Sequence, residues 1–200
     1  MTVEEYLAAH SVAKIQLGCG GNFLSGWLNT DITLYSNDAV YLDLTKQFPI
    51  QDSVFDYVYS EHTIEHLSYW QGAHMLQESY RILKPGGKIR ISCPDFQFLI
   101  NMYTNPQSLD QEYIQSELPS WAPYPGAIFI INNYVRDWGH QFIHDKTSLS
   151  FLLKAAGFEN ITEHQVRESN DPNLQNLEIV NRMKPGFLQL ETMTLEGVKP

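Results

Sequence analysis

The sequence predicts a single α/β domain built around a mainly parallel β-sheet. Three features support this prediction: short strands that are apolar on consecutive residues, a long amphipathic helix closed by Lys-Pro-Gly-Gly, and a glycine-rich turn after the first strand. Strands of this kind are buried on both faces, as in parallel sheets covered by helices. A chain of 200 residues is long enough to bury one such core.

Four short segments rich in Val, Ile, Tyr and Phe are expected to form the first strands. They are residues 13–17, 27–32, 39–44 and 54–60. Only nine residues, 18–26, separate the first strand from the second. A parallel crossover normally needs a dozen residues or more, so we expect a shortened first crossover without a full helix.

The period of the apolar residues changes over 69–83, where one face of a helix is expected. The apolar positions are Tyr69, Ala73, Leu76, Tyr80 and Leu83. Ser68 and Gln71 match a capping box that starts the helix, and the Pro-Gly-Gly at 85–87 ends it. The next strand is predicted at 88–94.

The second half of the chain gives weaker signals. Helices are expected at 96–103 and 109–118, and the segment 119–127, with three prolines, is expected to be a loop. Residues 130–145 have no clean period but many polar and aromatic side chains. We interpret residues 104–145, approximately, as a lid inserted into the domain.

The last quarter is expected to contain two helices and two strands. The first helix, 146–158, would be capped by Thr147 and stopped by Gly157. A strand at 161–166, a helix at 173–183 and a final strand at 187–195 would follow.

The charge balance excludes some partners. The chain carries 13 Lys and Arg against 23 Asp and Glu, a formal charge of −10. Such a surface repels phosphate backbones and anionic lipid, so neither nucleic acid nor a membrane is an expected partner. No apolar run has the length of a membrane span, and the N-terminal residues do not resemble a leader. Cys19 and Cys93 are interpreted as reduced thiols of a cytoplasmic protein.

The loop after the first strand, with the acids that follow it, suggests a nucleoside site. Gly18 and Gly20 allow close approach of a ligand, and Asp31 ends the second strand, where a carboxylate can accept ribose hydroxyls. Asp43 ends the third segment. Phe23 occupies the third glycine position of a dinucleotide fingerprint, which argues against a nicotinamide oxidoreductase.

Several motifs together resemble a known family. IQLGCGG, NTDI, YLDL, FDYVYSEHTIEHL, YRILKPGGKIRISCPD and LLKAAGF, between about residues 13 and 166, are similar to segments of class I S-adenosylmethionine-dependent methyltransferases. They are most like the small bacterial branch with LGCG…GWxNxDI and EHxxEHL segments. This resemblance implies a Rossmann-like fold with a mostly parallel seven-stranded sheet, a reversed last strand and helices on both faces. It also implies S-adenosyl-L-methionine as the cofactor.

The resemblance implies a set of cofactor contacts by motif position. The glycine turn would lie against the methionine moiety, Asp31 would bind the ribose, and Asp43 with Leu44 would lie beside the adenine. The end of the fourth strand would line the side that carries the methyl group. The complete set is Gly18, Cys19, Gly20, Asp31, Asp43, Leu44, Ser60 and Glu61.

Methyl transfer needs an oriented acceptor and, for a hydroxyl, a general base. His62, just after the fourth strand, and His140, after the proline-rich segment, are the candidate catalytic residues. Either could instead be a partly buried histidine bonded to the backbone, and His66 and His144 are weaker candidates.

Four residues of the lid are candidate acceptor contacts. Arg136 and Asp137 could bind a polar or anionic acceptor, or pair with each other. Tyr134 and Trp138 could stack on a sugar or ring, or form a small core of the lid. We therefore expect methyl transfer to oxygen or nitrogen of a small polar molecule or sugar precursor.

Two alternatives remain at this stage. His62-Thr63-Ile64-Glu65-His66 has the H-x-x-E-H spacing of a zinc hydrolase. Two histidines four apart share a face only on a continuous helix, and the predicted helix starts at Ser68, after this motif. No acid stands out as a further ligand, so no metal is expected. The other alternative is a non-catalytic accessory domain that binds S-adenosylmethionine without turning it over.

Overall fold

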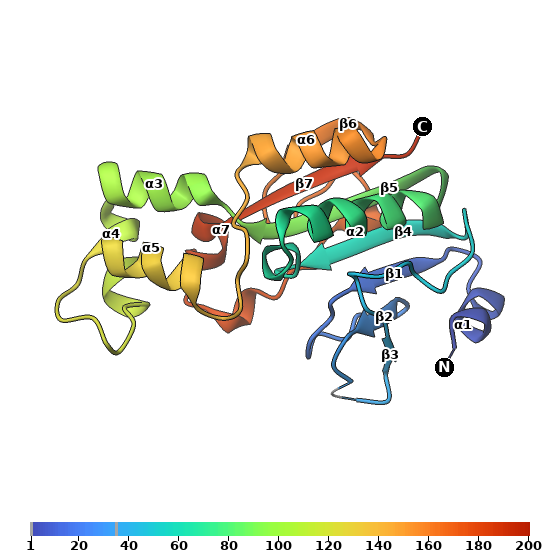
Figure 1. The fold of residues 1–200 in the computed structure, drawn as a ribbon, viewed down its shortest axis with the longest axis horizontal. Coiled ribbons are helices and arrows are strands. Elements are labelled where there is room, and N and C mark those ends of the chain that lie inside the picture. Colours follow the sequence, from blue (N-terminus) through green and yellow to red (C-terminus); the bar gives the residue numbers. More distant parts are fainter. Residues whose placement is uncertain (1, 35) are drawn as a thin grey trace.

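A seven-stranded sheet lies at the centre of the computed structural model, which describes residues 2–34 and 36–200 (Figure 1). The strand order is β3-β2-β1-β4-β5-β7-β6. The strands are β1 (Lys14–Leu17), β2 (Leu28–Asp31), β3 (Ala39–Tyr41), β4 (Phe55–Glu61), β5 (Leu83–Pro94), β6 (Glu159–His164) and β7 (Thr192–Val198).

The strand directions agree with the predicted fold class. β1 to β5 pair in parallel, whereas β7 runs antiparallel to both β5 and β6. The sheet is therefore Rossmann-like with a reversed last strand. The third strand is shorter than expected and ends at Tyr41, so Asp43 and Leu44 lie in the turn that follows it. Residues 18–27, between β1 and β2, contain no helix, as the short spacing predicts.

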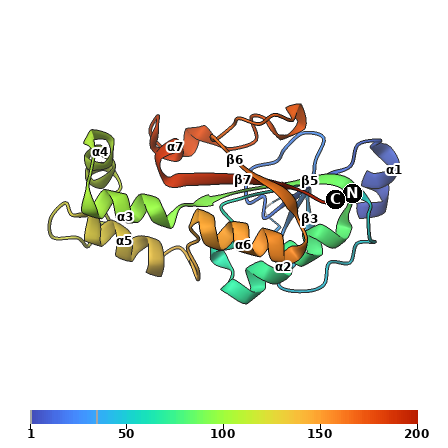
Figure 2. The same cartoon turned by 90° about the horizontal axis from the view of Figure 1, so that it is seen from above.

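The helices are distributed unevenly around this sheet (Figures 1 and 2). They are α1 (Val3–Ala9), α2 (Tyr69–Ile82), α3 (Phe96–Thr104), α4 (Ser108–Ser116), α5 (Ala127–Arg136), α6 (Lys146–Ala156) and α7 (Phe187–Glu191), with short 3-10 turns at Ile64–His66, Pro172–Leu174 and Val180–Arg182. Helices α2 and α6 pack side by side on one face, where they enclose the main apolar core. None of the helices described here is long and apolar enough to cross a membrane.

The caps of α2 and α6 show which local signals were reliable. Ser68 accepts a hydrogen bond from the Gln71 amide, and the Gln71 side chain accepts one from the Ser68 amide, so the predicted capping box is confirmed. The predicted cap of α6 is wrong by two positions. Asp145, rather than Thr147, accepts from the Ser148 amide at 2.7 Å. A carboxylate at this position also complements the positive end of the helix dipole.

The opposite face of the sheet is covered by the irregular segment 165–186 and α7 (Figure 2). The helix predicted at 173–183 is wrong, because this stretch forms two 3-10 turns joined by an irregular connection in which Asn176 has φ +60°. The physical reason is a buried ionic cluster: Arg90, fully buried on β5, donates to Glu178 at 2.7 Å and to Glu196 of β7 at 2.5 Å. Burying Glu178 in this cluster holds the backbone in a path that a regular helix would not follow.

A second lobe lies beyond the carboxyl end of β5, at the opposite end of the sheet from α1 (Figures 1 and 2). It consists of α3, α4 and α5, and it packs with α7 around its own apolar cluster, which includes Phe98, Tyr113, Tyr134 and Phe187. The final strand was predicted to begin at residue 187, but residues 187–191 are helical and the strand starts at Thr192. Phe187 and Leu188 are buried in that helical turn, so its apolar residues serve packing between the lobes.

Candidate active site

The glycine turn after β1 is shaped by its contact with Thr63. Gly18 has φ +68°, and a Cβ at this position would lie 2.4 Å from Cγ2 and Oγ1 of Thr63. Thr63 Oγ1 is within hydrogen-bond distance of the carbonyls of Gly18 (3.2 Å) and Glu61 (3.0 Å). Gly18 is therefore required for steric reasons, and Thr63 ties the turn to the end of β4.

Asp31 and Asp43 are held by backbone and side-chain donors. Asp31 accepts hydrogen bonds of 2.8 Å from the amides of Gly20 and Thr33. Asp43 accepts hydrogen bonds from the amide and the hydroxyl of Thr45, at 2.9 and 2.6 Å. Both bonds lower the pKa of Asp43, and the bond from the hydroxyl has the larger effect. Both carboxylates are only half-buried, and a carboxylate has lone pairs for further donors.

These groups line a cavity of about 500 Å³, which we call the cofactor cavity. Its size is in the range of small-molecule sites. The lining residues are Gly18, Gly20, Asp31, Ile32, Thr33, Leu42, Asp43, Leu44, Thr45, His62, Thr63, His66, Leu67, Gln71 and Gln141.

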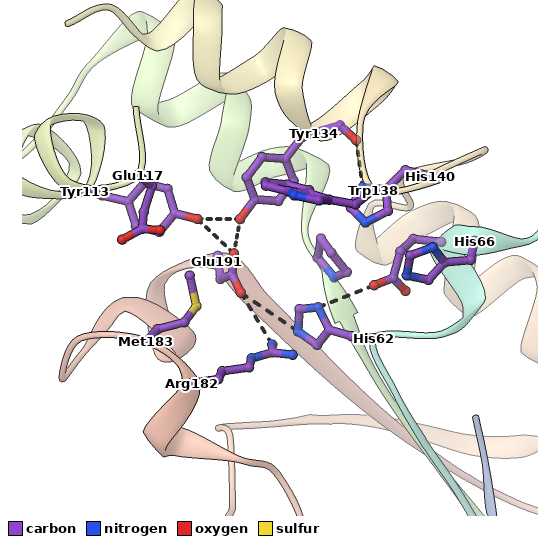
Figure 3. Close-up of a pocket in the computed structure, with 12 residues that line it drawn as sticks. His62, His66, Tyr113, Glu117, Tyr134, Trp138, His140, Arg182, Met183 and Glu191 are labelled. Atoms are coloured by element: carbon purple, nitrogen blue, oxygen red, sulfur yellow. Dashed lines mark hydrogen bonds and ion pairs between the residues drawn. The ribbon is translucent and has the colours of Figure 1, made fainter. Parts of the chain in front are cut away.

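A second cavity of about 510 Å³, which we call the acceptor cavity, lies between the sheet edge and the helical lobe (Figure 3). Its lining residues are His62, Glu65, His66, Pro94, Tyr113, Glu117, Tyr134, Trp138, His140, Arg182, Met183 and Glu191. His62 and His66 line both cavities, so the turn between β4 and α2 forms a shared wall.

Glu191, at the end of α7, is the centre of a polar cluster in the acceptor cavity (Figure 3). Tyr113 donates to its Oε2 at 2.9 Å, Tyr134 donates to the same oxygen, and Arg182 Nη2 lies 3.5 Å from Oε1. Burial raises the pKa of Glu191 to about 7. This carboxyl can therefore exist in either protonation state near neutral pH.

His62 occupies a left-handed backbone conformation, with φ +44°, directly after β4. Its Nε2 lies 3.0 Å from Thr192 Oγ1 and 3.9 Å from Glu191 Oε1, and its Nδ1 lies 3.3 Å from Glu65 Oε1. The imidazole is thus aimed into the acceptor cavity with an acid on either side of it.

His140 also lines the acceptor cavity, in the connection between α5 and α6. Its Nδ1 lies 2.7 Å from the Tyr134 carbonyl, which fixes Nδ1 as the protonated nitrogen because a carbonyl only accepts. Burial lowers the pKa of His140, which favours the neutral imidazole. Its ring packs edge-on against His66, with 4.8 Å between the ring centroids.

Comparison with known families gives a match in the first half of the chain. Residues 15–91, from β1 into β5, match the family model described as a methyltransferase domain. This match covers less than half of the chain, so it shows that this segment is similar to a methyltransferase domain. S-adenosylmethionine is the methyl donor of class I methyltransferases, and the matched segment includes the glycine turn, Asp31, Asp43 and His62. The search of curated proteins gave no match.

Solved structures confirm the methyltransferase fold over nearly the whole chain. A methyltransferase of Thermotoga maritima, described as a possible histamine N-methyltransferase, is 16% identical, with a TM-score of 0.59 over 98% of this chain and 86% of that one. A methyltransferase of Archaeoglobus fulgidus is 17% identical, with a TM-score of 0.57 over 94% of this chain and 87% of that one. Phosphoethanolamine N-methyltransferase 2 of Haemonchus contortus, in complex with phosphomonomethylethanolamine and S-adenosylhomocysteine, is 13% identical (TM-score 0.54) over 99% of this chain and 53% of that one.

Three of the expected cofactor contacts do not line the cofactor cavity: Cys19, Ser60 and Glu61. The Ser60 hydroxyl is buried and donates to the Leu17 carbonyl at 3.1 Å. Glu61 faces the irregular segment and accepts from the Ile179 amide at 3.1 Å. Successive strand residues point to opposite faces, so a position at a strand end does not by itself bring a side chain to the ligand.

The expected acceptor contacts divide into two pairs. Tyr134 and Trp138 line the acceptor cavity, whereas Arg136 and Asp137 line a different cavity with Trp121. Tyr134 and Arg136 are both on α5, where residues two apart point in different directions. Asp137 and Trp138 follow the helix, and Trp138 has a left-handed backbone with φ +56°.

Sequence reasoning missed most residues of the acceptor cavity. Tyr113, Glu117, Arg182, Met183 and Glu191 come from α4, the irregular segment and α7, and they have no shared motif. In the cofactor cavity, Thr63 and Gln71 could have been predicted as lining residues, because Thr63 lies within the E-H-x-x-E-H segment and Gln71 belongs to the capping box.

Proposed function

We propose that the chain transfers the methyl group of S-adenosylmethionine to nitrogen or oxygen of a small polar molecule. The cofactor would bind in the cofactor cavity and the acceptor in the acceptor cavity. The observation that carries this proposal is the shared wall, because His62 and His66 line both cavities. Two ligands that meet at one wall satisfy the first requirement of a transfer reaction, which is proximity.

The residues of the cofactor cavity fit the chemistry of S-adenosylmethionine. Gly18 and Gly20 leave backbone exposed for the methionine moiety, Asp31 offers a carboxylate to the ribose hydroxyls, and Asp43 with Leu44 would lie beside the adenine. The bound cofactor supplies an activated methyl group whose leaving group is a neutral thioether.

The chain's own residues would orient the acceptor, exclude water and accept a proton. His62 is the candidate base, since its imidazole lies at the shared wall. His140 would serve to position the acceptor, because its Nδ1 is already bonded to a carbonyl. We propose that residues 104–145 act as a lid over the acceptor, with Tyr134 and Trp138 as its contacts.

The charges of the acceptor cavity favour an amine over an acceptor rich in phosphate. Glu65, Glu117 and Glu191 line the cavity, against the single guanidinium of Arg182. Aromatic faces such as Trp138 also attract ammonium groups. One of the similar structures is described as a possible histamine N-methyltransferase, which is consistent with an amine acceptor. Two free, buried cysteines fit the expected cytoplasmic setting.

Calorimetric titration with S-adenosylmethionine, S-adenosylhomocysteine and NAD⁺ tests the cofactor. We expect micromolar binding of the two adenosyl compounds and none of NAD⁺. Asp31→Ala should weaken that binding by about 1–3 kcal/mol, the loss for unpaired buried hydroxyls. Asp38→Ala, at an exposed acid that bonds Ser36, is the matched control. Failure of either adenosyl compound to bind would refute the proposal.

Turnover separates the enzyme from a non-catalytic accessory domain. Purified protein is incubated with labelled S-adenosylmethionine and a panel of small amines and hydroxyl compounds. Transfer of label to an amine, above the rate with S-adenosylmethionine alone, supports the proposal. Tight cofactor binding with no transfer to any member of the panel would favour a non-catalytic accessory domain that binds S-adenosylmethionine.

A further inference from the structure

The Glu65 carboxylate is buried without a hydrogen-bond donor. The residue is 1% exposed, and neither carboxylate oxygen has a hydrogen-bond partner among the described residues. His62 Nδ1 lies 3.3 Å from Oε1, at ion-pair distance. A buried carboxylate is costly unless it is paired or coordinates a metal. Among the described residues, the His62 imidazole is the ion-pair partner of Glu65, and the carboxylate oxygens keep lone pairs for a further ligand.

The fold brings two further metal-binding groups to this carboxylate. Glu65, His66 and His140 each offer one ligand atom, and these atoms all lie within 4.8 Å of one another. Figure 3 shows His66 and His140 adjacent at one end of the acceptor cavity, although they are far apart in the sequence.

Backbone hydrogen bonds hold the two segments together. The amides of Gln141 and Phe142 donate to the Glu65 carbonyl at 2.7 and 3.2 Å. The Gln141 side chain donates to the His66 carbonyl at 2.7 Å. The positions of His66 and His140 relative to Glu65 are thus fixed by the scaffold and not by the side chains themselves.

His140 also has the outer contact typical of a metal-binding histidine. Such a histidine usually donates its other ring N–H to a carbonyl or carboxylate, which sets the tautomer that binds the metal. The His140 Nδ1 bond to the Tyr134 carbonyl does this, and it leaves Nε2 with the lone pair.

We propose that Glu65, His66 and His140 bind one divalent transition-metal ion at the wall shared by the two cavities. Two imidazoles and one carboxylate suit Zn²⁺, Fe²⁺ or Co²⁺ and leave open coordination positions. All three residues line the acceptor cavity, so the ion would be reachable from it.

This ligand set differs from the H-x-x-E-H pattern. Glu65 and His66 lie in a 3-10 turn, so they do not share the helix face of a zinc hydrolase. His140 comes from 74 positions further along the chain, which explains why the sequence alone indicated no metal.

The metal alone provides the test. The full chain is dialysed against a chelator and titrated with Zn²⁺ by calorimetry and with Co²⁺ by visible absorption. We expect one ion per chain and a Co²⁺ band characteristic of nitrogen and oxygen ligands. His66→Asn, at an exposed position, and His140→Asn should each weaken binding by at least about 10-fold. Glu65→Gln should do the same while keeping the side-chain shape.

His10→Asn is the matched control, because the His10 Nδ1 also bonds a carbonyl, that of Tyr6, at 2.9 Å. It should leave Zn²⁺ affinity unchanged. No saturable binding, or equal binding by His10→Asn and His66→Asn, would overturn the proposal; Glu65 would then be paired with His62 alone. Binding of S-adenosylhomocysteine is measured separately, so failure of the metal site is distinguishable from failure of the proposed function.

Discussion

Tyr113 of the helical lobe donates a 2.9 Å hydrogen bond to Glu191, the last residue before the final strand. Tyr134, from the neighbouring helix, donates to the same oxygen. A single carboxyl thus joins α4 and α5 to the start of β7. Because burial raises its pKa to about 7, the charge of this junction changes near neutral pH.

Glu191→Gln should remove a pH dependence of stability. In the folded chain the Glu191 pKa is raised from 4.5 to about 7, so between these values the native state binds more protons than the unfolded state. The unfolding free energy of the protein therefore falls as pH rises through this window. The carboxyl accounts for a decline on the order of 3 kcal/mol. Chemical denaturation at pH 5 and pH 8 should show the decline in the wild type and a smaller one in Glu191→Gln.

The neighbours of Glu191 act in both directions, which makes a control necessary. His62 and the Tyr113 hydroxyl lower its pKa, whereas Glu65 and Glu117 raise it. Glu112→Gln, at an exposed position of α4, should keep the wild-type pH dependence. A slope identical in wild type and Glu191→Gln would show that Glu191 keeps an ordinary pKa.

Gly18→Ala and Gly20→Ala form a matched pair. Both glycines have positive φ, +68° and +52°, so both alanines carry strain of about 1–2 kcal/mol. Only the Gly18 Cβ meets other atoms, those of Thr63 at 2.4 Å, whereas the Gly20 Cβ has no described atom within 4 Å. We expect Gly18→Ala to be less stable by thermal denaturation and to lose more S-adenosylhomocysteine affinity. Equal effects would mean that contact with Thr63 is easily relieved.

His62→Asn should separate catalysis from cofactor binding. Asparagine tolerates the left-handed backbone that His62 adopts, at φ +44°, so the turn should keep its shape. Loss of a general base lowers turnover by about 10²–10⁴-fold. With an acceptor in hand, kcat should fall in that range while the Kd for S-adenosylhomocysteine stays near the wild-type value. Full activity in His62→Asn would remove His62 from the catalytic machinery.

Arg90→Met should destabilise the domain strongly. Arg90 is fully buried and paired with Glu178 and Glu196, and removing one partner of a buried ionic group costs about 3–5 kcal/mol. Hydrogen exchange should accelerate first in residues 165–182, which this cluster anchors. Lys146→Met, which breaks an exposed pair with Glu163, should hardly change the denaturation midpoint. A mild effect of Arg90→Met would indicate that the two carboxylates accept protons instead.

The sequence predicted the parallel half of the fold well, because its signals are local. The capping box at Ser68 and the short loop after β1 depend on neighbouring residues, and both are confirmed. The apolar segments also form strands, although β3 ends earlier and β5 begins earlier than predicted. The matched family segment, residues 15–91, covers the same half.

The remaining errors come from contacts between distant residues. The stretch 173–183 resembles a helix in its own composition, but Glu178 is drawn into the cluster around Arg90, 88 positions away. The helical turn at Phe187 is stabilised by packing against Tyr113 in the other lobe, which no local pattern encodes. The acceptor cavity was missed for the same reason, since Tyr113 and Glu191 meet only through this packing.

The wall shared by the two cavities would couple their proposed ligands thermodynamically. If either ligand shifts the turn at 62–66, it changes the affinity of the other cavity by a factor that is equal in both directions. An acceptor that tightens the binding of S-adenosylmethionine must itself bind more tightly when that cofactor is present. Product release would then be cooperative too, because departure of the methylated acceptor would lower the affinity for S-adenosylhomocysteine.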